Sequence, residues 1–339
     1  MVAVGHTPPL LETHQFNDPE DLIMTTNAAP LSVPPSAAPA LANLRLGTAP
    51  DSWGVWFPDD PKQVPWHQFL DEAAAAGYTA VELGPFGYLP TEPEQLRDEL
   101  GRRDLILSGA TAGTALHRGP GALSEALEEC RRVAALVAAL DAPYLITLPA
   151  MFTDLYTGEL LEPAELTSEQ WKSLGDGHTE LGRALLEEFG VRQMFHPHAD
   201  AHVEGEASID RFLEVTDPAS VSLCLDTGHI AYGGGDNRAI VAKHPSRIGY
   251  VHLKSVDPAV IARVRAEHIC FADAVQLGAM VEPDGGEPEM PALLADLDGL
   301  GLPLWAIVEH DMYPAPAGQP LAVATRTCSY YAARGLRGP

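Results

Sequence analysis

Four short apolar runs in the second half of the chain each end in side chains that can bind a metal ion. Imidazoles and carboxylates together suit a divalent transition metal such as Mn²⁺, Co²⁺, Fe²⁺ or Zn²⁺, whereas Mg²⁺ accepts two imidazoles less readily. Six of the 13 histidines fall between residues 196 and 252. The runs are VRQMFH, with His196 and His198, VSLCLD, with Asp226 and His229, GYVHLK, with His252 and Lys254, and LWAIVE, with Glu309.

A single residue of this kind is more often a hydrogen-bonded, half-buried polar group than a metal ligand. That explanation is weaker for the four run ends together, because an uncompensated buried carboxylate costs several kcal/mol, of the order of 3–5. We therefore predict a metal centre, if the fold brings these four run ends together.

The elements that must position these residues follow a regular order from Leu44 onward. Strand-length apolar runs alternate with amphipathic stretches eight times in about 270 residues, which predicts a (β/α)8 TIM barrel with its reactive residues at the C-terminal strand ends. A doubly wound open sheet is the rival, but no GxGxxG follows the first run. Strands are expected at 44–49, 78–83, 105–110, 144–149, 191–196, 221–226, 249–254 and 304–309, and helices at 66–77, 92–103, 121–140, 168–190, 208–216, 237–244, 258–268 and 288–301.

The barrel is expected to have a segment on either side. Residues 1–43 include a Pro/Ala-rich tract without strand or helix periodicity, which predicts a mobile N-terminal extension. Residues 44–315 are the predicted catalytic barrel, and residues 316–339 are predicted to form a C-terminal helix and tail.

Several motifs resemble a known superfamily. HPHADAHVEG, LCLDTGHIAYGGGD, GYVHLKS and IVEH resemble the sugar phosphate isomerase/epimerase superfamily of xylose-isomerase-like TIM barrels, and the chain is most similar to the inosose (2-keto-myo-inositol) dehydratase family. GTAPDSWGVWFPDDP (47–61) and YTAVELGPFGYLP (78–90) resemble the first two strand ends of that family. The most specific part of the resemblance is DTGH with GGD, followed by HLK.

The resemblance implies metal ligands at Asp226, His252 and Glu309. Superfamily isomerases generally have a Glu-x-His pattern at the fifth strand end, where this chain has His196 and His198. A His-rich end is similar to the inosose dehydratases and favours a dehydratase over an isomerase. Whether His196 or a water completes the coordination sphere stays open.

A second departure from the family pattern lies at the seventh strand end. The family commonly reads His-Leu-Lys-Asp there, whereas this chain has Ser255 after Lys254, with Asp257 as a candidate replacement two positions later. If the missing carboxylate holds a substrate hydroxyl, this departure affects which substrate is bound.

Such a site suits the dehydration of a cyclic polyol ketone through an enediolate, which a divalent metal stabilises. His198 or His229, kept neutral beside the dication, is the candidate base or acid. Glu82, expected on the opposite rim, is either an alternative acid/base or a carboxylate that holds a substrate hydroxyl. Lys254 is expected to neutralise enediolate charge or to bind hydroxyls.

Other residues are candidates for substrate binding. Trp53, Trp56 and Phe86 are expected to wall the apolar face of a ring, although buried aromatics are more often plain core. His117 and Arg118 follow the third strand, where Arg118 is a candidate phosphate ligand. A formal net charge of −26, from 21 Lys+Arg against 47 Asp+Glu, disfavours anionic substrates and favours a neutral polyol.

The same acidity argues against nucleic-acid and anionic-membrane partners. No run approaches the length of a membrane span, no basic leader is visible, and the four cysteines are scattered without metal-ligand spacing. A cytoplasmic chain is expected, and a homo-oligomer stays open.

We predict an enzyme, a divalent-metal-dependent carbon–oxygen lyase acting on 2-keto-myo-inositol or a close relative in myo-inositol catabolism. Mn²⁺ or Co²⁺ is the expected ion, with Zn²⁺, Fe²⁺ and Mg²⁺ open. The alternatives are a sugar or inosose isomerase/epimerase with the same metal site, a C-glycoside-cleaving subunit, and a non-catalytic sugar-binding barrel.

Overall fold

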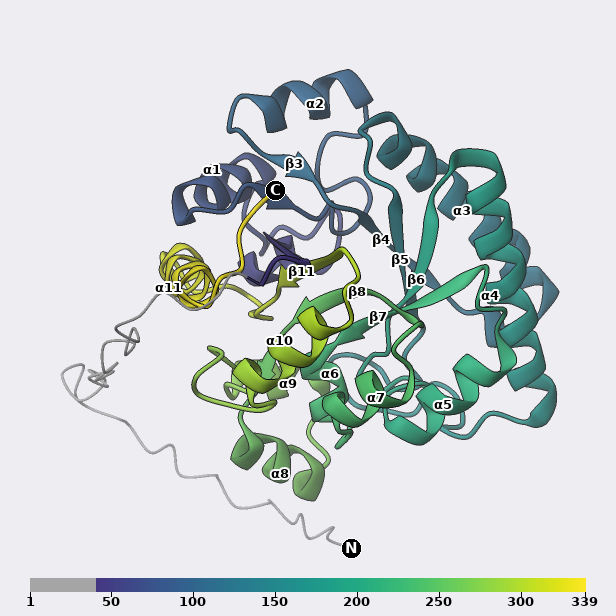
Figure 1. Cartoon of the computed structure of the whole chain (residues 1–339). Coiled ribbons are helices and arrows are strands. Elements are labelled where there is room, and N and C mark those ends of the chain that lie inside the picture. Colours follow the sequence, from purple (N-terminus) through teal and green to yellow (C-terminus); the bar gives the residue numbers. More distant parts are fainter. Residues whose placement is uncertain (1–40) are drawn as a thin grey trace, which may run out of the picture. The chain divides into compact units, whose positions relative to one another are not determined.

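Parallel strands form a closed ring in the computed structural model, which describes residues 41–339 (Figure 1). Neighbouring strands follow the order β3-β2-β1-β11-β8-β7-β6-β5-β4, and each neighbouring pair is parallel. The strands are β1 (Leu44–Thr48), β2 (Ala80–Val81), β3 (Ile106–Leu107), β4 (Ala110–Thr114), β5 (Tyr144–Pro149), β6 (Arg192–Phe195), β7 (Val221–Asp226), β8 (Ile248–Leu253) and β11 (Leu304–Val308).

The ring closes through the third barrel strand. β3 pairs with β2, β4 pairs with β5, and only Ser108 and Gly109 separate these two halves. The sequence predicts one strand over 105–110, whereas the structure has two short strands that together extend to Thr114. The prediction ends too early because the residues after Gly109 are less apolar and do not continue the apolar pattern. With β3 and β4 counted as one barrel strand, the (β/α)8 prediction is confirmed.

Eight helices follow the barrel strands in turn and cover the outside of the ring (Figure 1). None of the described helices is long and apolar enough to cross a membrane. The helices are α1 (Trp66–Ala76), α2 (Pro93–Gly101), α3 (Pro120–Ala139), α4 (Ser168–Phe189), α5 (Glu206–Val215), α7 (Asn237–Lys243), α10 (Met290–Gly299) and α11 (Gln319–Ala333). Of the predicted extension, residues 1–40 lie outside the described residues.

Local sequence signals set the ends of the longest helix, α4. The Thr167 hydroxyl accepts a hydrogen bond from the Gln170 N–H, and Gln170 Oε1 accepts one from the Thr167 N–H, forming a capping box. The helix ends at Gly190, whose positive φ of 70° suits a residue without a Cβ.

Additional short elements sit on the C-terminal side of β7 and β8. They are α6 (Thr227–Tyr232), β9 (Ser255–Val256), α8 (Pro258–Glu267), α9 (Phe271–Gln276) and β10 (Met280–Val281), with β9 and β10 antiparallel. The predicted helix at 258–268 is therefore part of this insertion, and α10 covers the barrel after β8. Tyr232, Ile261, Phe271 and Met280 form the insertion's own apolar cluster, which fixes its position beside the strand ends.

The barrel interior is a packed apolar core. Ile146, Met194, Tyr250 and Ile307 meet there from four strands, and the Tyr250 hydroxyl donates to Ser108 Oγ at 2.9 Å. Strands buried on both faces explain why the strand sequences read as continuous apolar runs. Polar side chains at the strand ends are consequently confined to the rim.

Candidate metal centre and active site

Four neighbouring barrel strands bring the predicted ligands together. His196 follows β6, Asp226 ends β7, His252 lies in β8 and Glu309 follows β11, which are adjacent in the ring. One ligand atom from each lies within 4.8 Å of the others, and the four residues are at most 8% exposed. The structure thus assembles a buried imidazole and carboxylate cluster from residues that are far apart in the chain.

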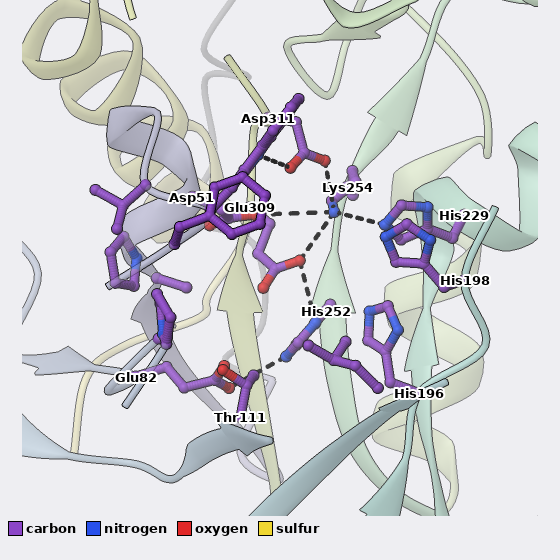
Figure 2. A pocket seen from close by; sticks show the side chains of 18 of the residues that line it. Asp51, Glu82, Thr111, His196, His198, His229, His252, Lys254, Glu309 and Asp311 are labelled. Carbon is purple, nitrogen blue, oxygen red and sulfur yellow. Dashed lines mark hydrogen bonds and ion pairs between the residues drawn. The ribbon is translucent and has the colours of Figure 1, made fainter. Parts of the chain in front are cut away.

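His252 directs its Nδ1 toward this cluster (Figure 2). Its Nε2 lies 3.1 Å from Glu82 Oε2 in a hydrogen bond, so Nε2 carries the proton. Its Nδ1 lies 3.1 Å from Glu309 Oε2 and 3.6 Å from Asp226 Oδ2 but has no hydrogen-bond partner. An unpartnered nitrogen facing two carboxylates is the arrangement that a cation between them would satisfy.

Asp226 has two separate tasks, one for each carboxylate oxygen. Oδ1 accepts hydrogen bonds from the N–H groups of Gly228 and His229, at 2.9 and 2.7 Å, and so begins α6 directly at the strand end. Oδ2 faces the site, 3.1 Å from His196 Nε2 and 3.4 Å from Lys254 Nζ. The Asp-Thr-Gly-His sequence therefore both orients a carboxylate and places His229 in the first helical turn.

The cluster is strongly polarised. Burial opposes a second proton on His252, but Cys224 and the Glu309 carboxylate outweigh it and raise the His252 pKa well above 6.5. Burial also opposes ionisation of Glu309, yet the charges of His252 and Lys254 lower its pKa to about 2. The carboxylates are thus held ionised around a position that favours a positive charge, and the donor set fits a divalent transition ion.

Lys254 lies at the centre of a second set of carboxylates, at the cavity side of the cluster (Figure 2). Its Nζ is 2.7 Å from Asp311 Oδ2, 3.0 Å from Glu309 Oε2 and 3.9 Å from Asp51 Oδ2. Burial works against the ammonium, but these carboxylates and Asp226 raise the Lys254 pKa well above its ordinary value. Lys254 is therefore a fixed cation in a 2% exposed position.

His198 and His229 form a closely packed pair beside Lys254, with their rings tilted by 32°. Their ring centroids are 3.9 Å apart, and His229 Nε2 lies 3.1 Å from Lys254 Nζ. Burial and the neighbouring His196 lower the His198 pKa to about 4, and burial with His198 lowers the His229 pKa well below 6.5. Both imidazoles are neutral near pH 7, which is the form that can accept a proton.

A cavity of about 790 Å³, its open mouth included, joins these groups. Trp56 and Phe271 form an apolar part of the wall, with ring centroids 5.9 Å apart, and Phe271 also lies 5.3 Å from the His198 ring. An apolar wall opposite a few convergent polar groups is typical of a small-molecule site.

A family model described as a xylose isomerase-like TIM barrel matches residues 70–327. The chain belongs to this family. Inosose dehydratases are among its curated relatives, one from Geobacillus kaustophilus with 34% identity over 80% of this chain and 89% of the relative, and one from Clostridium perfringens with 28% identity over 85% and 97%. The predicted resemblance is confirmed, as is the prediction of an enzyme.

Solved structures of this xylose isomerase-like type share the fold at low identity. The IolI protein with a bound zinc atom has a TM-score of 0.65 and 16% identity, and covers 86% of this chain and 99% of its own. The probable 3-DHS dehydratase AsbF from Bacillus anthracis has a TM-score of 0.63 and 13% identity, and the match covers 85% of this chain and 98% of AsbF. At these identities the likeness shows the barrel alone.

Several residues predicted for substrate binding in this xylose isomerase-like barrel lie elsewhere. Trp53 is fully buried in the core, where it packs edge-on against Phe69 at 4.9 Å and donates Nε1–H to Glu72 at 2.8 Å. Phe86 is half-buried beside the cavity-lining Pro85 but does not line the cavity itself. Of the three predicted aromatics, Trp56 is the one that lines the cavity.

His117 and Arg118 also lie away from the cavity. His117 Nε2 and Arg118 Nη2 both contact Glu162 Oε1, at 3.0 and 3.1 Å. Asp257, the candidate replacement for the family's fourth-position Asp, instead accepts hydrogen bonds from the first N–H groups of α8. The position of these three residues near strand ends therefore does not predict the groups that their side chains contact.

Glu82 is closer to the cluster than predicted. Expected on the opposite rim, it contacts His252 directly, because β2 lies across a narrow barrel mouth from β8. Its other oxygen, Oε1, is buried without a hydrogen-bond partner, and Glu82 lines the cavity. The contact gives Glu82 a positioning role toward His252.

Other cavity residues were missed from the sequence. Asp51 follows β1 in a short 3₁₀ helix, Asp311 follows Glu309 by two positions, and Phe271 begins α9. The sequence contains a signal for Asp51 and Asp311, because both come shortly after a strand end. Phe271 has no such signal, because the insertion after β8 brings it to the cavity.

Proposed function

We propose that this enzyme is a divalent-metal-dependent dehydratase of a neutral cyclic polyol ketone, 2-keto-myo-inositol or a close relative. The observation that carries the proposal is the buried His196, Asp226, His252 and Glu309 cluster, which opens into the cavity that holds the His198 and His229 pair. The curated relatives named inosose dehydratase support the same reaction class. When bound, a divalent ion supplies Lewis acidity, which polarises the ketone and favours the enediolate.

The paired histidines, His198 and His229, are suited to move the proton. A neutral His198 or His229 accepts the proton from the carbon next to the carbonyl, and the resulting imidazolium returns it to the departing β-hydroxyl, which leaves as water. Both rings adjoin the predicted metal cluster and the cavity. The Lys254 ammonium, 3.1 Å from His229, stabilises the negative charge that develops on the substrate oxygens.

The charge of the cavity wall supports a neutral substrate. Besides the predicted ligands His196, His252 and Glu309 it contains the carboxyl groups of Asp51, Glu82 and Asp311, and its described cation is Lys254, which already contacts Asp51 and Asp311. A carboxylate or phosphate on the substrate would lie close to these carboxyl groups and be repelled by those that are ionised. A polyol supplies hydroxyl donors that the carboxylates can bind.

Product analysis tests the reaction. Enzyme loaded with Mn²⁺ or Co²⁺ is incubated with 2-keto-myo-inositol, and we expect ultraviolet absorbance from the dehydrated dione and loss of water by mass. NMR in D₂O separates the isomerase alternative, since isomerisation conserves mass. No absorbance or mass change with Mn²⁺, Co²⁺, Zn²⁺, Fe²⁺ or Mg²⁺ contradicts the proposal.

A further inference from the structure

A second group of potential ligands lies on the barrel rim outside the cavity. It consists of His117, in the 3₁₀ helix Leu116–Arg118 after β4, Glu162, in the connection between β5 and α4, and His202, in the connection between β6 and α5. One ligand atom from each lies within 4.8 Å of the others, and the two imidazole centroids are 4.6 Å apart. None of the three lines the cavity.

We propose that His117, Glu162 and His202 form a second metal site, which binds Zn²⁺ or a similar borderline transition ion. Two imidazoles and one carboxylate are a common three-residue set for zinc, with a fourth position left to water. This site has two imidazoles for one carboxylate, which is a softer donor set than that of the first cluster, where imidazoles and carboxylates are equal in number.

The distances in the group need small changes to accept an ion. Ligand atoms about 2.1 Å from a tetrahedral zinc are about 3.4 Å from one another. His117 Nε2 and Glu162 Oε1 are 3.0 Å apart and therefore need to separate by a few tenths of an ångström. The His202 ligand atom lies within 4.8 Å of the other two, and His202 and Glu162 both lie on loops, which can supply any remaining approach.

His202 is already in the tautomer that a metal requires. Its Nε2 lies 3.1 Å from the Pro163 carbonyl oxygen, which can only accept, so Nε2 carries the proton and Nδ1 keeps its lone pair. Metal-binding histidines usually donate their other N–H to such a carbonyl, which fixes the ring. Pro163 is next to Glu162, so one loop supplies both a ligand and the partner that orients another.

Packing holds His117 in place. Adding a Cβ to Gly177 of α4 would bring it to 3.1 Å from Leu116 Cβ, so this glycine allows the 3₁₀ helix to lie close to α4. His117 is consequently 4% exposed. Arg118, which contacts Glu162, has a side chain 51% exposed and can turn into solvent when an ion binds.

An ion here would connect the loops that also form the cavity wall. The β5–α4 connection supplies the cavity residues Met151 and Leu155, and Met151 pairs with Ala201, the neighbour of His202. The His198 N–H donates to the Val203 carbonyl on the other side of His202. An ion at the second site would therefore join these two loops, and the proposal does not depend on the proposed reaction.

Zinc stoichiometry tests the proposal. Metal-free full-length protein is loaded with Zn²⁺, separated from free ion by gel filtration, and analysed by mass spectrometry for metal per chain. We compare His202→Ala and Glu162→Gln with two controls, His67→Ala on α1 and Glu165→Gln in the same loop, both at exposed positions. Circular dichroism checks that each variant is folded. If His202→Ala does not fold, the test rests on Glu162→Gln, which keeps the size of the side chain.

We expect each site variant to lose one zinc equivalent and each control to lose none. The same loss is expected in a Glu309→Gln background, where the first cluster is disabled, so failure of the first site and failure of the second are distinguishable. Wild-type zinc content in both site variants overturns the proposal. An equal loss in His67→Ala also overturns it, because the ion then binds adventitiously to surface histidines.

Discussion

Glu82 Oε2 accepts a hydrogen bond from His252 Nε2 across 3.1 Å, and both side chains are at most 1% exposed. The bond fixes the tautomer of His252 and aims its Nδ1 at Glu309 and Asp226. A carboxylate behind a ligating histidine also increases the basicity of the ring. Glu82 therefore acts on the proposed ion through His252.

Glu82→Gln tests this positioning role. The amide oxygen can still accept from His252 Nε2, but the negative charge is lost, so we expect metal affinity at the first cluster to fall by about 10- to 100-fold. Competition with a chelator of known affinity measures the change, with Mn²⁺ as the ion and exposed Glu94→Gln as the control. Unchanged affinity in Glu82→Gln would assign Glu82 to another task.

Removal of the metal is expected to lower thermal stability. An ion that binds only the folded state at about 1,000 times its Kd contributes about 4 kcal/mol to stability. Chelation of the wild type should lower Tm by several degrees and abolish activity, and Mn²⁺ should restore both. His252→Ala should remain folded and show no Mn²⁺-dependent shift in Tm; an unchanged Tm on chelation of metal-loaded wild type contradicts the metal centre.

His178 is expected to make stability depend on pH. It is fully buried on α4 between Phe195 and Phe212, at ring distances of 5.0 and 5.3 Å, and burial lowers its pKa from 6.5 to about 3. Below pH 6.5 the unfolded chain binds a proton that the native chain does not, so stability falls as pH falls toward 3. The contribution lost between pH 7 and pH 5 is about 2 kcal/mol.

Urea unfolding at the two pH values measures this loss. His178→Leu keeps an apolar side chain in the same place and should reduce the difference between pH 7 and pH 5 by about 2 kcal/mol, although it costs Gln193 a partner at both values. The exposed His67→Leu is the matched control and should leave the difference as in the wild type. An equal pH dependence in His178→Leu and wild type would show that His178 titrates normally.

The sequence predicts the barrel and the ligand cluster because both depend on strand ends. Asp226 and Glu309 each end or directly follow an apolar run, and parallel neighbours must bring such ends to one rim. The interruption at Ser108 and Gly109 was not predictable from an apolar pattern, since a break in pairing depends on the partners β2 and β5.

Side chains in loops were predicted less well for a physical reason. His117 comes shortly after a strand and Asp226 ends one, but the packing of the His117 3₁₀ helix against α4 turns His117 toward Glu162. Phe271 reaches the cavity from a position far beyond β8, through an insertion whose path depends on tertiary packing. Strand-end position therefore identifies candidates, and the loop contacts decide which of them meet.

The close approach of Lys254 explains why the Asp-Thr-Gly-His motif has a glycine at position 228. A Cβ at this position would lie 2.7 Å from Lys254 Cβ and 2.8 Å from Lys254 Cδ, closer than real carbon contacts allow. Because Lys254 is 2% exposed and held by several carboxylates, it has little room to retreat. Gly228→Ala should therefore shift the ammonium by part of an ångström to about one ångström and lower kcat by about 100-fold.

Steady-state kinetics with the proposed ketone substrate, together with metal content, checks this expectation. Metal content should stay at the wild-type level, because the Gly228→Ala variant keeps the backbone N–H that donates to Asp226. Gly121→Ala is the control, since this helical glycine in α3 has no atom within 4 Å of an added Cβ, and its kcat should not change. If Gly228→Ala keeps wild-type kcat, the Lys254 position does not limit the reaction, and the charge stabilisation assigned to this lysine must come from another group.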